Sequence, residues 1–167
     1  MKSNASKMTF TKSALALSAA TLILVGCGKG DNKSAAVPAD GVEVKIGHVA
    51  PLTGPIAHLG KDNENGARLA LEEINKAGLT IDGKKVILTL VPEDDAEDPK
   101  TATQVAQKLV DAKVVGVVGH LNSGTSIPAS KIYSDAGITQ ISPSATNPDY
   151  TKQGFKTTYR LVATDAQ

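Results

Sequence analysis

Residues 114–128, VVGVVGHLNSGTSIP, decide the fold of this chain. The stretch begins with a short run of β-branched residues, which is typical of a buried strand. After Gly119 it becomes a loop of small polar residues, and Pro128 then stands near the expected first turn of a helix. A strand that leads hydroxyl groups and free backbone N–H groups to the start of a helix predicts a binding site for a small anion.

The same strand-to-helix pattern recurs on both sides of this stretch. Strands are expected at 42–49, 86–91, 114–118, 138–141 and 158–162, and helices are expected to begin at Asp62, at Asp98 and at Thr125 or Ser126. The alternation predicts an α/β fold with three layers, in which helices cover both faces of a parallel sheet. We expect the strand order 2-1-3-4-5, which brings the loops 50–60, 119–126 and 142–148 to one edge.

The N-terminus has the pattern of an export signal. Three lysines precede an apolar run at 13–25, which is shorter than the roughly 20 residues of a membrane span. Cys27, the single cysteine, follows Gly26 and resembles the acylated cysteine of bacterial lipoproteins; an ordinary secretory signal is the alternative. We therefore expect a lipoprotein signal peptide at 1–27, a flexible tether at 28–40, and a folded domain at 41–167 of an exported protein anchored to the membrane by lipid at Cys27.

The charge argues against a nucleic-acid partner. Three of the 18 basic residues lie in the expected signal, so the remaining chain has a net charge of −2. No basic patch with interleaved aromatic residues is present in the sequence. A single cysteine also excludes a disulfide within the chain.

Other chemistries fit the sequence less well. The acidic run at 93–98 could bind Ca²⁺ or accept phosphate, but it lacks the central glycine of a calcium loop. A receiver domain needs its carboxylates after the first and third strands, and this chain has none there. His48, His58 and His120 share an edge of the expected sheet but not the spacing of metal ligands. The motifs of serine hydrolases, P-loop proteins and dinucleotide-binding proteins are missing. We expect no catalytic residues, no metal and no cofactor.

Hydroxyl groups follow two neighbouring strands of the expected sheet. Ser123, Thr125, Ser144 and Thr146 could donate to a carboxylate, and nearby loop carbonyls could accept from an ammonium group. The alternative is that these residues only build turns and helix caps. Their common location favours binding of a small zwitterion.

Several segments of the chain resemble the periplasmic branched-chain amino acid-binding proteins of ABC transporters. They are VKIGHVAPLTGPIAHLG, GARLALEEIN, DDAEDPKTATQVAQKLV, GVVGHLNSGTSIPASKIYSDAGI and ISPSATNP. The resemblance implies a type I periplasmic-binding fold, in which two lobes with flavodoxin-like strand order close over an amino acid. It implies an ABC permease as partner and the following ligand-binding residues: Ser123 and Thr146 for the carboxylate, the carbonyl at Ser144 for the ammonium, Ala145 between them, and Leu121 and Asn122 at the side-chain pocket.

Three features depart from that family. Well-known members place a tyrosine against the ligand where this chain has Leu59, and some join the positions of Ala96 and Asn122 by a disulfide. The family is also about twice as long, so we expect residues 41–167 to form the N-terminal lobe only. A sensing module that reports to a signalling partner, and an exported α/β enzyme, remain the alternative functions.

Overall fold

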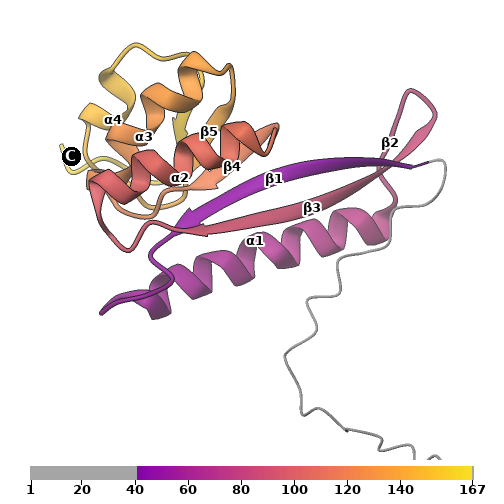
Figure 1. The fold of residues 1–167 in the computed structure, drawn as a ribbon, viewed down its shortest axis with the longest axis horizontal. Coiled ribbons are helices and arrows are strands. Elements are labelled where there is room, and N and C mark those ends of the chain that lie inside the picture. Colours follow the sequence, from indigo (N-terminus) through magenta and orange to yellow (C-terminus); the bar gives the residue numbers. More distant parts are fainter. Residues whose placement is uncertain (1–40, 167) are drawn as a thin grey trace, which may run out of the picture. The chain divides into compact units, whose positions relative to one another are not determined.

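The computed structural model describes residues 41–166, which form one six-stranded sheet with helices on both faces (Figure 1). The strands follow the spatial order β2-β3-β1-β4-β5-β6. Their bounds are β1 Val42–Ala50, β2 Thr80–Ile81, β3 Lys84–Asp94, β4 Gly116–Gly119, β5 Thr139–Ser142 and β6 Thr158–Arg160. The helices are α1 Ala57–Ala77, α2 Pro99–Asp111, α3 Ser123–Asp135 and α4 Asp149–Lys152.

The predicted order of the five parallel strands is confirmed. β3, β1, β4, β5 and β6 pair in parallel, in the order expected from the strand–helix alternation. The sheet also has a short edge strand that was not predicted: β2 pairs antiparallel with β3 through a turn at Asp82 and Gly83. Both turn residues have positive φ values, 50° and 76°, which a tight hairpin requires.

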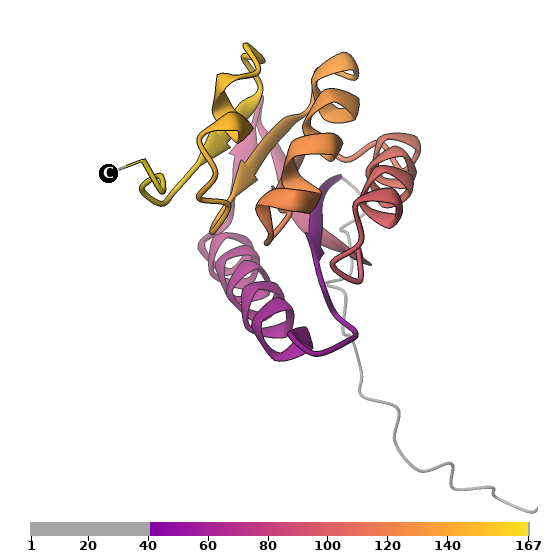
Figure 2. The ribbon, with the colours of Figure 1, turned by 90° about the vertical axis from the view of Figure 1, so that its left-hand side faces the viewer.

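Figure 2 shows α2 and α3 on one side of the sheet and α1 on the other. On the α2/α3 side the apolar residues form a continuous core: Val49, Val105, Ala106, Leu109, Val114, Val117, Ala129, Tyr133 and Ile138. A Cβ atom on Gly47 would lie 2.9 Å from Cδ1 of Leu109, so the lack of a side chain at Gly47 lets α2 approach the middle of β1.

Helix α1 packs on β1 and β3, with Leu71 as its buried apolar residue, and polar side chains add directed contacts. The Asn75 side chain donates to the carbonyl of Leu88 and accepts from its N–H group, both at 2.8 Å. Glu64 is buried and accepts from Lys61 and from Nε of Arg68, also at 2.8 Å. These bonds satisfy polar groups that would otherwise be costly to bury.

Two helix starts differ from the prediction. Helix α1 begins at Ala57 instead of Asp62, because Gly60 lets its first turn lie against Pro51. A Cβ atom on Gly60 would be 2.0 Å from the carbonyl oxygen of Pro51. Helix α3 begins at Ser123 after the N-cap residue Asn122, so Thr125 and Ser126 are not caps.

The hydroxyl groups of Thr125 and Ser126 donate to carbonyl oxygens of residues 122 and 120 instead of accepting from helix amides. The earlier start places Pro128 inside α3, beyond the first turn where it was expected. Two strands are also shorter than predicted: β4 begins at Gly116 and β6 ends at Arg160.

The predicted signal peptide, the lipidation site Cys27 and the tether lie outside the described residues. Within 41–166, no helix combines the length and the apolar character that a membrane span requires.

Candidate functional site

The loops after β4 and β5 meet at the carboxyl edge of the sheet. The hydroxyl of Ser144 donates to the carbonyl of Leu121 at 2.7 Å, and Oγ of Ser123 accepts from the N–H group of Asn147 at 3.1 Å. These two bonds confirm that the two loops converge, as the strand order predicted.

Ser123 is set up as a hydrogen-bond donor. It is the first residue of α3, where backbone N–H groups have no partner inside the helix. Its oxygen accepts from Asn147, which leaves the hydroxyl proton free for another acceptor. The hydroxyl and the first amides of α3 together favour a negative group at this position.

Thr146 has a different hydrogen-bonding state. Its hydroxyl donates to Oδ2 of Asp165 at 2.9 Å, and the N–H group of Asp165 donates back to the Thr146 carbonyl at 3.1 Å. The hydroxyl proton is therefore engaged, and the remaining lone pairs of this oxygen can accept a hydrogen bond. The backbone N–H group of Thr146 has no hydrogen-bond acceptor within residues 41–166.

Ala145 supports the loop from inside. Its side chain is buried, its N–H group donates to Oγ of Ser142 at 2.9 Å, and its carbonyl accepts from Arg160 at 3.0 Å. Both polar groups of the Ala145 backbone are thus occupied, whereas the Ser144 carbonyl and the Thr146 N–H group have no hydrogen-bond partner within residues 41–166.

Arg160 is a residue of this region that the sequence reading missed. From β6, its guanidinium donates to the carbonyls of Ala145 and Asn147 at 3.0 and 2.8 Å, and it also contacts Thr151. Its charged carbon lies 5.7 Å from the centre of the Tyr150 ring. The sequence predicts a strand at 158–162, but only the folded structure shows that Arg160 of this strand holds the loop after β5.

The other predicted site residues lie around this pair of loops. Leu121 is buried, and Asn122 donates from Nδ2 to Oε1 of Glu97 at 3.3 Å, which brings the loops after β3 and β4 together. Leu59 lies in the first turn of α1 with 44% of its surface exposed. No hydrogen bond between Leu59 and the two polar loops is present in the described part of the chain.

The acidic run after β3 builds loop structure. Asp94 accepts from the Leu52 and Ala96 N–H groups at 2.8 Å and from the Thr53 hydroxyl at 2.6 Å. Burial works to raise the pKa of Asp94, but these hydrogen bonds outweigh it and hold the pKa below its usual range.

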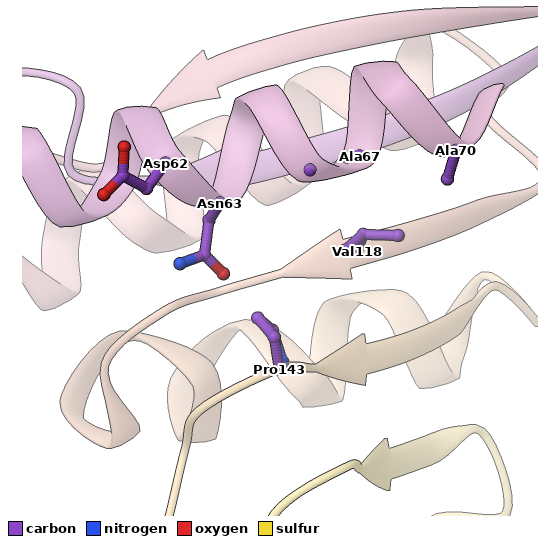
Figure 3. Close-up of a pocket in the computed structure, with 7 residues that line it drawn as sticks. Asp62, Asn63, Ala67, Ala70, Val118 and Pro143 are labelled. Atoms are coloured by element: carbon purple, nitrogen blue, oxygen red, sulfur yellow. The ribbon is translucent and has the colours of Figure 1, made fainter. Parts of the chain in front are cut away.

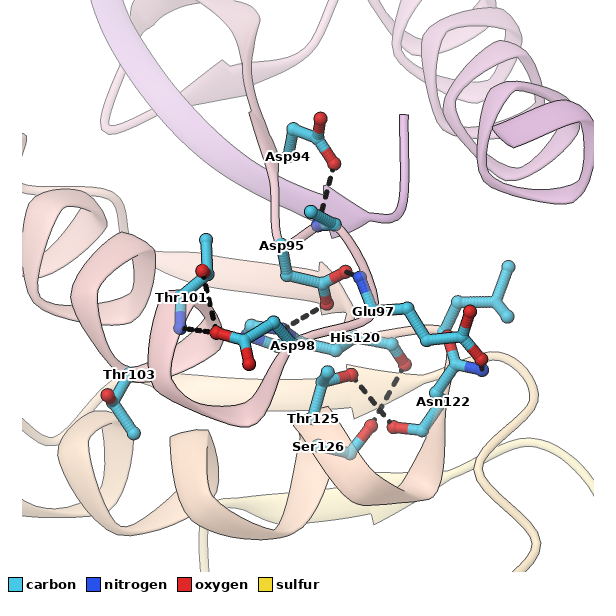
Figure 4. A network of polar contacts seen from close by, with 12 residues as sticks. Asp94, Asp95, Glu97, Asp98, Thr101, Thr103, His120, Asn122, Thr125 and Ser126 are labelled. Atoms are coloured by element: carbon cyan, nitrogen blue, oxygen red, sulfur yellow. Dashed lines mark hydrogen bonds and ion pairs between the residues drawn. The ribbon is translucent and has the colours of Figure 1, made fainter. Parts of the chain in front are cut away.

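The predicted cap of the second helix is confirmed, because Asp98 accepts from the N–H group of Thr101 at 2.7 Å. Figure 4 shows how this acidic run continues through Asp95 toward His120 and the start of α3. Residues 41–166 contain no cluster of side chains that could hold a metal ion.

A cavity of about 480 Å³ lies elsewhere, between α1 and the neighbouring strands (Figure 3). Its lining is Asp62, Asn63, Gly66, Ala67, Ala70, Val118 and Pro143. None of the predicted site residues lines this cavity, but Pro143 belongs to the loop after β5, so the cavity adjoins one of the two polar loops.

The chain is similar to known proteins in both sequence and fold. The Leu/Ile/Val-binding protein homolog 1 of Brucella abortus is 45% identical over 125 residues, which cover 75% of this chain and 33% of that protein. A binding protein of Pseudomonas aeruginosa, named for leucine, isoleucine, valine, threonine and alanine, is 44% identical over 122 residues, which cover 73% and 32%. The chain thus spans about a third of the length of these curated relatives.

Among solved structures, the branched-chain amino acid transporter substrate-binding protein LivJ of Streptococcus pneumoniae, in complex with isoleucine, superposes with a TM-score of 0.68. The sequence identity is 36%, over 75% of this chain and 35% of that one. The fold is therefore that of a type I periplasmic-binding lobe. The profile of the periplasmic binding protein family matches residues 43–167, and the chain belongs to this family.

Proposed function

We propose that this chain is part of the solute-binding component of an ABC importer and takes an amino acid with an aliphatic, branched side chain. The converging loops after β4 and β5 carry the proposal, because they combine free donors and free acceptors within one short edge. The similar proteins with names that refer to leucine, isoleucine and valine support this choice of solute.

The hydrogen-bond pattern orients the ligand. Its carboxylate meets the Ser123 hydroxyl, the first amides of α3 and the backbone N–H group of Thr146. Its ammonium meets the Thr146 hydroxyl oxygen and the Ser144 carbonyl, because the Thr146 proton is already donated to Asp165. Charge-assisted hydrogen bonds of this kind contribute about 1.5–3 kcal/mol each. Leu121, Asn122 and Leu59 border the ligand side chain, and Ala145 keeps the loop in place.

The family places this protein outside the cytoplasm, and the N-terminal pattern agrees with export. We propose that the signal peptide ends before Cys27, that a lipid on this cysteine anchors the protein, and that an ABC permease receives the solute. A sensor of the same fold would bind the ligand through the same two loops, and would be distinguished by a signalling protein instead of a permease as its partner. We propose no catalytic role.

An NMR titration of the chain with millimolar L-leucine tests this function. We expect the largest amide shifts at Ser123, Gly124 and Thr146, smaller shifts with L-aspartate or L-lysine, and weak affinity, since one lobe offers only part of the contacts. Leucinamide, which lacks the carboxylate, is the matched control ligand, and Ser123→Ala is the matched variant.

Both controls should remove most of the response. Equal shifts from leucine and leucinamide, or shifts confined to α1 and β2, would show that the polar loops are not an amino-acid site.

A further inference from the structure

His120 follows β4 directly and is fully buried. Its Nδ1 lies 2.8 Å from Oδ2 of Asp95, and its Nε2 lies 3.2 Å from the hydroxyl of Tyr133 (Figure 4 shows the Asp95 contact). An ionised carboxylate only accepts, so the ring proton belongs on Nδ1, and Nε2 then accepts from Tyr133. The imidazole is held from two sides, by the loop after β3 and by α3.

The backbone of the same residue joins the two polar loops. Its carbonyl accepts from the hydroxyl of Ser126 in α3 at 3.0 Å and from the hydroxyl of Ser142 in β5 at 2.6 Å. The Ser142 oxygen in turn accepts from the N–H group of Ala145 at 2.9 Å. One peptide carbonyl therefore sets the distance between the start of α3, with Ser123, and the loop that carries Thr146.

We propose that His120 is a positioning residue for the ligand site, whose imidazole, clamped between Asp95 and Tyr133, fixes the carbonyl that spaces Ser123 from Thr146. The proposal rests on the proposed function of the two loops. It extends that function to a buried side chain that does not itself reach the loop edge.

This pattern of donors and acceptors corresponds to a neutral imidazole. Protonation at Nε2 would reverse the hydrogen bond, with Nε2–H donating to the Tyr133 oxygen, and would take from the Tyr133 proton its acceptor. The ionisable groups in contact with the ring are Asp95 from the loop after β3 and Tyr133 from α3, and His48 of β1 interacts with it electrostatically. Burial lowers the pKa of His120 more than Asp95 raises it, which favours the neutral form at neutral pH.

Tyr133→Phe tests the clamp with the smallest possible change, because it removes one hydroxyl and keeps the buried ring. Ile87→Val is the control: Ile87 is a buried residue near the start of β3, far along that strand from Asp95 and on a different strand from the two polar loops, and the change costs stability without touching the clamp. Each protein is titrated with L-leucine by NMR at neutral pH, and its stability is measured by urea unfolding.

We expect Tyr133→Phe to weaken leucine binding about three- to tenfold, the range that one hydrogen bond covers. Ile87→Val should lose stability and keep the wild-type affinity. The ring ¹⁵N signals of His120 should show a proton on Nδ1 in the wild type. The pH at which leucine affinity declines on acidification should shift in Tyr133→Phe and not in Ile87→Val.

A second readout needs no ligand. If the clamp spaces the loops, Tyr133→Phe should speed hydrogen exchange at the Ala145 and Asn147 amides more than at amides of α1. Unchanged exchange at these amides and unchanged affinity, despite a loss of stability, would overturn the proposal. A wild-type chain without any response to leucine would instead defeat the proposed function, while the exchange experiment would still report on the clamp.

Discussion

The two faces of the sheet are built differently. On the α2/α3 face, β1 and β4 present Val49 and Val117 to two helices in a continuous apolar core, beside which the buried Gln140 of β5 lies on the same face. On the α1 face, β1 presents the fully buried His48, and α1 adds the buried carboxylate of Glu64 and the amide of Asn75. The first face has a continuous apolar core, whereas the second combines buried apolar residues such as Leu71 with directed polar contacts.

The two faces also differ in exposure. Tyr159 of β6 lies on the α1 side, because it pairs through Ile141 and Val118 with His48, and it is 51% exposed. On α1 itself Leu69 is 56% exposed. Parallel sheets are normally covered on both faces. The α1 face of the sheet is therefore left open at β6.

The largest expected effect compares a leucine in the core of the α2/α3 face with an exposed leucine of α1, by Leu109→Ala and Leu69→Ala. Leu109 is fully buried against β1 and β4, so its truncation should lower the free energy of unfolding by about 2–5 kcal/mol. Leu69→Ala on the exposed side of α1 should change it by less than about 0.5 kcal/mol. Urea unfolding of both variants provides the measurement, and similar losses would contradict the difference in burial between the two side chains.

Smaller changes in stability are expected when two glycines of helix α1 are replaced by alanine. Gly60→Ala would bring a Cβ to 2.0 Å from the Pro51 carbonyl oxygen, and overpacking of this kind costs about 1–3 kcal/mol. Gly66 has no atom within 4 Å of the position of an added Cβ, so Gly66→Ala should raise helix stability by about 0.5–1 kcal/mol. Thermal unfolding compares the two, and a shift of the same sign in both would contradict the close approach at Gly60.

A third prediction concerns how the buried histidines respond to pH. Burial lowers the pKa of both His48 and His120 below the ordinary value of 6.5. The unfolded chain then binds more protons, so the free energy of unfolding should fall as the pH drops below 6.5, by up to about 1.4 kcal/mol per pH unit for each histidine. Asp94 and Glu64 have lowered pKa values and add their own loss only at more acidic pH.

Urea unfolding between about pH 6.5 and pH 5 isolates the histidines from these carboxylates. His48→Leu should remove about half of the slope, because two buried histidines with lowered pKa values contribute to it. A slope that is unchanged in this variant would show that His48 does not titrate on unfolding in this range.

Much of the site could be anticipated from local signals. Ser123 and Thr146 follow strands of clear β-branched character, and the rule that parallel strands end at one edge brings their loops together. Whether each hydroxyl donates or accepts a hydrogen bond could not be predicted from these local signals, because a hydroxyl can do both. Its role depends on partners such as Asn147 and Asp165, which approach only in the folded chain.

The sequence by itself determined the α/β class, the order of the parallel strands and the location of the polar loops. Hydrophobic periodicity and the handedness of strand–helix–strand connections are local properties that carry this information. Only the tertiary structure decided that Arg160 holds the loop after β5, that His120 joins Asp95 to Tyr133, and that α1 reaches back to Pro51. These contacts connect residues that are distant along the chain, and their geometry depends on how whole elements pack against each other.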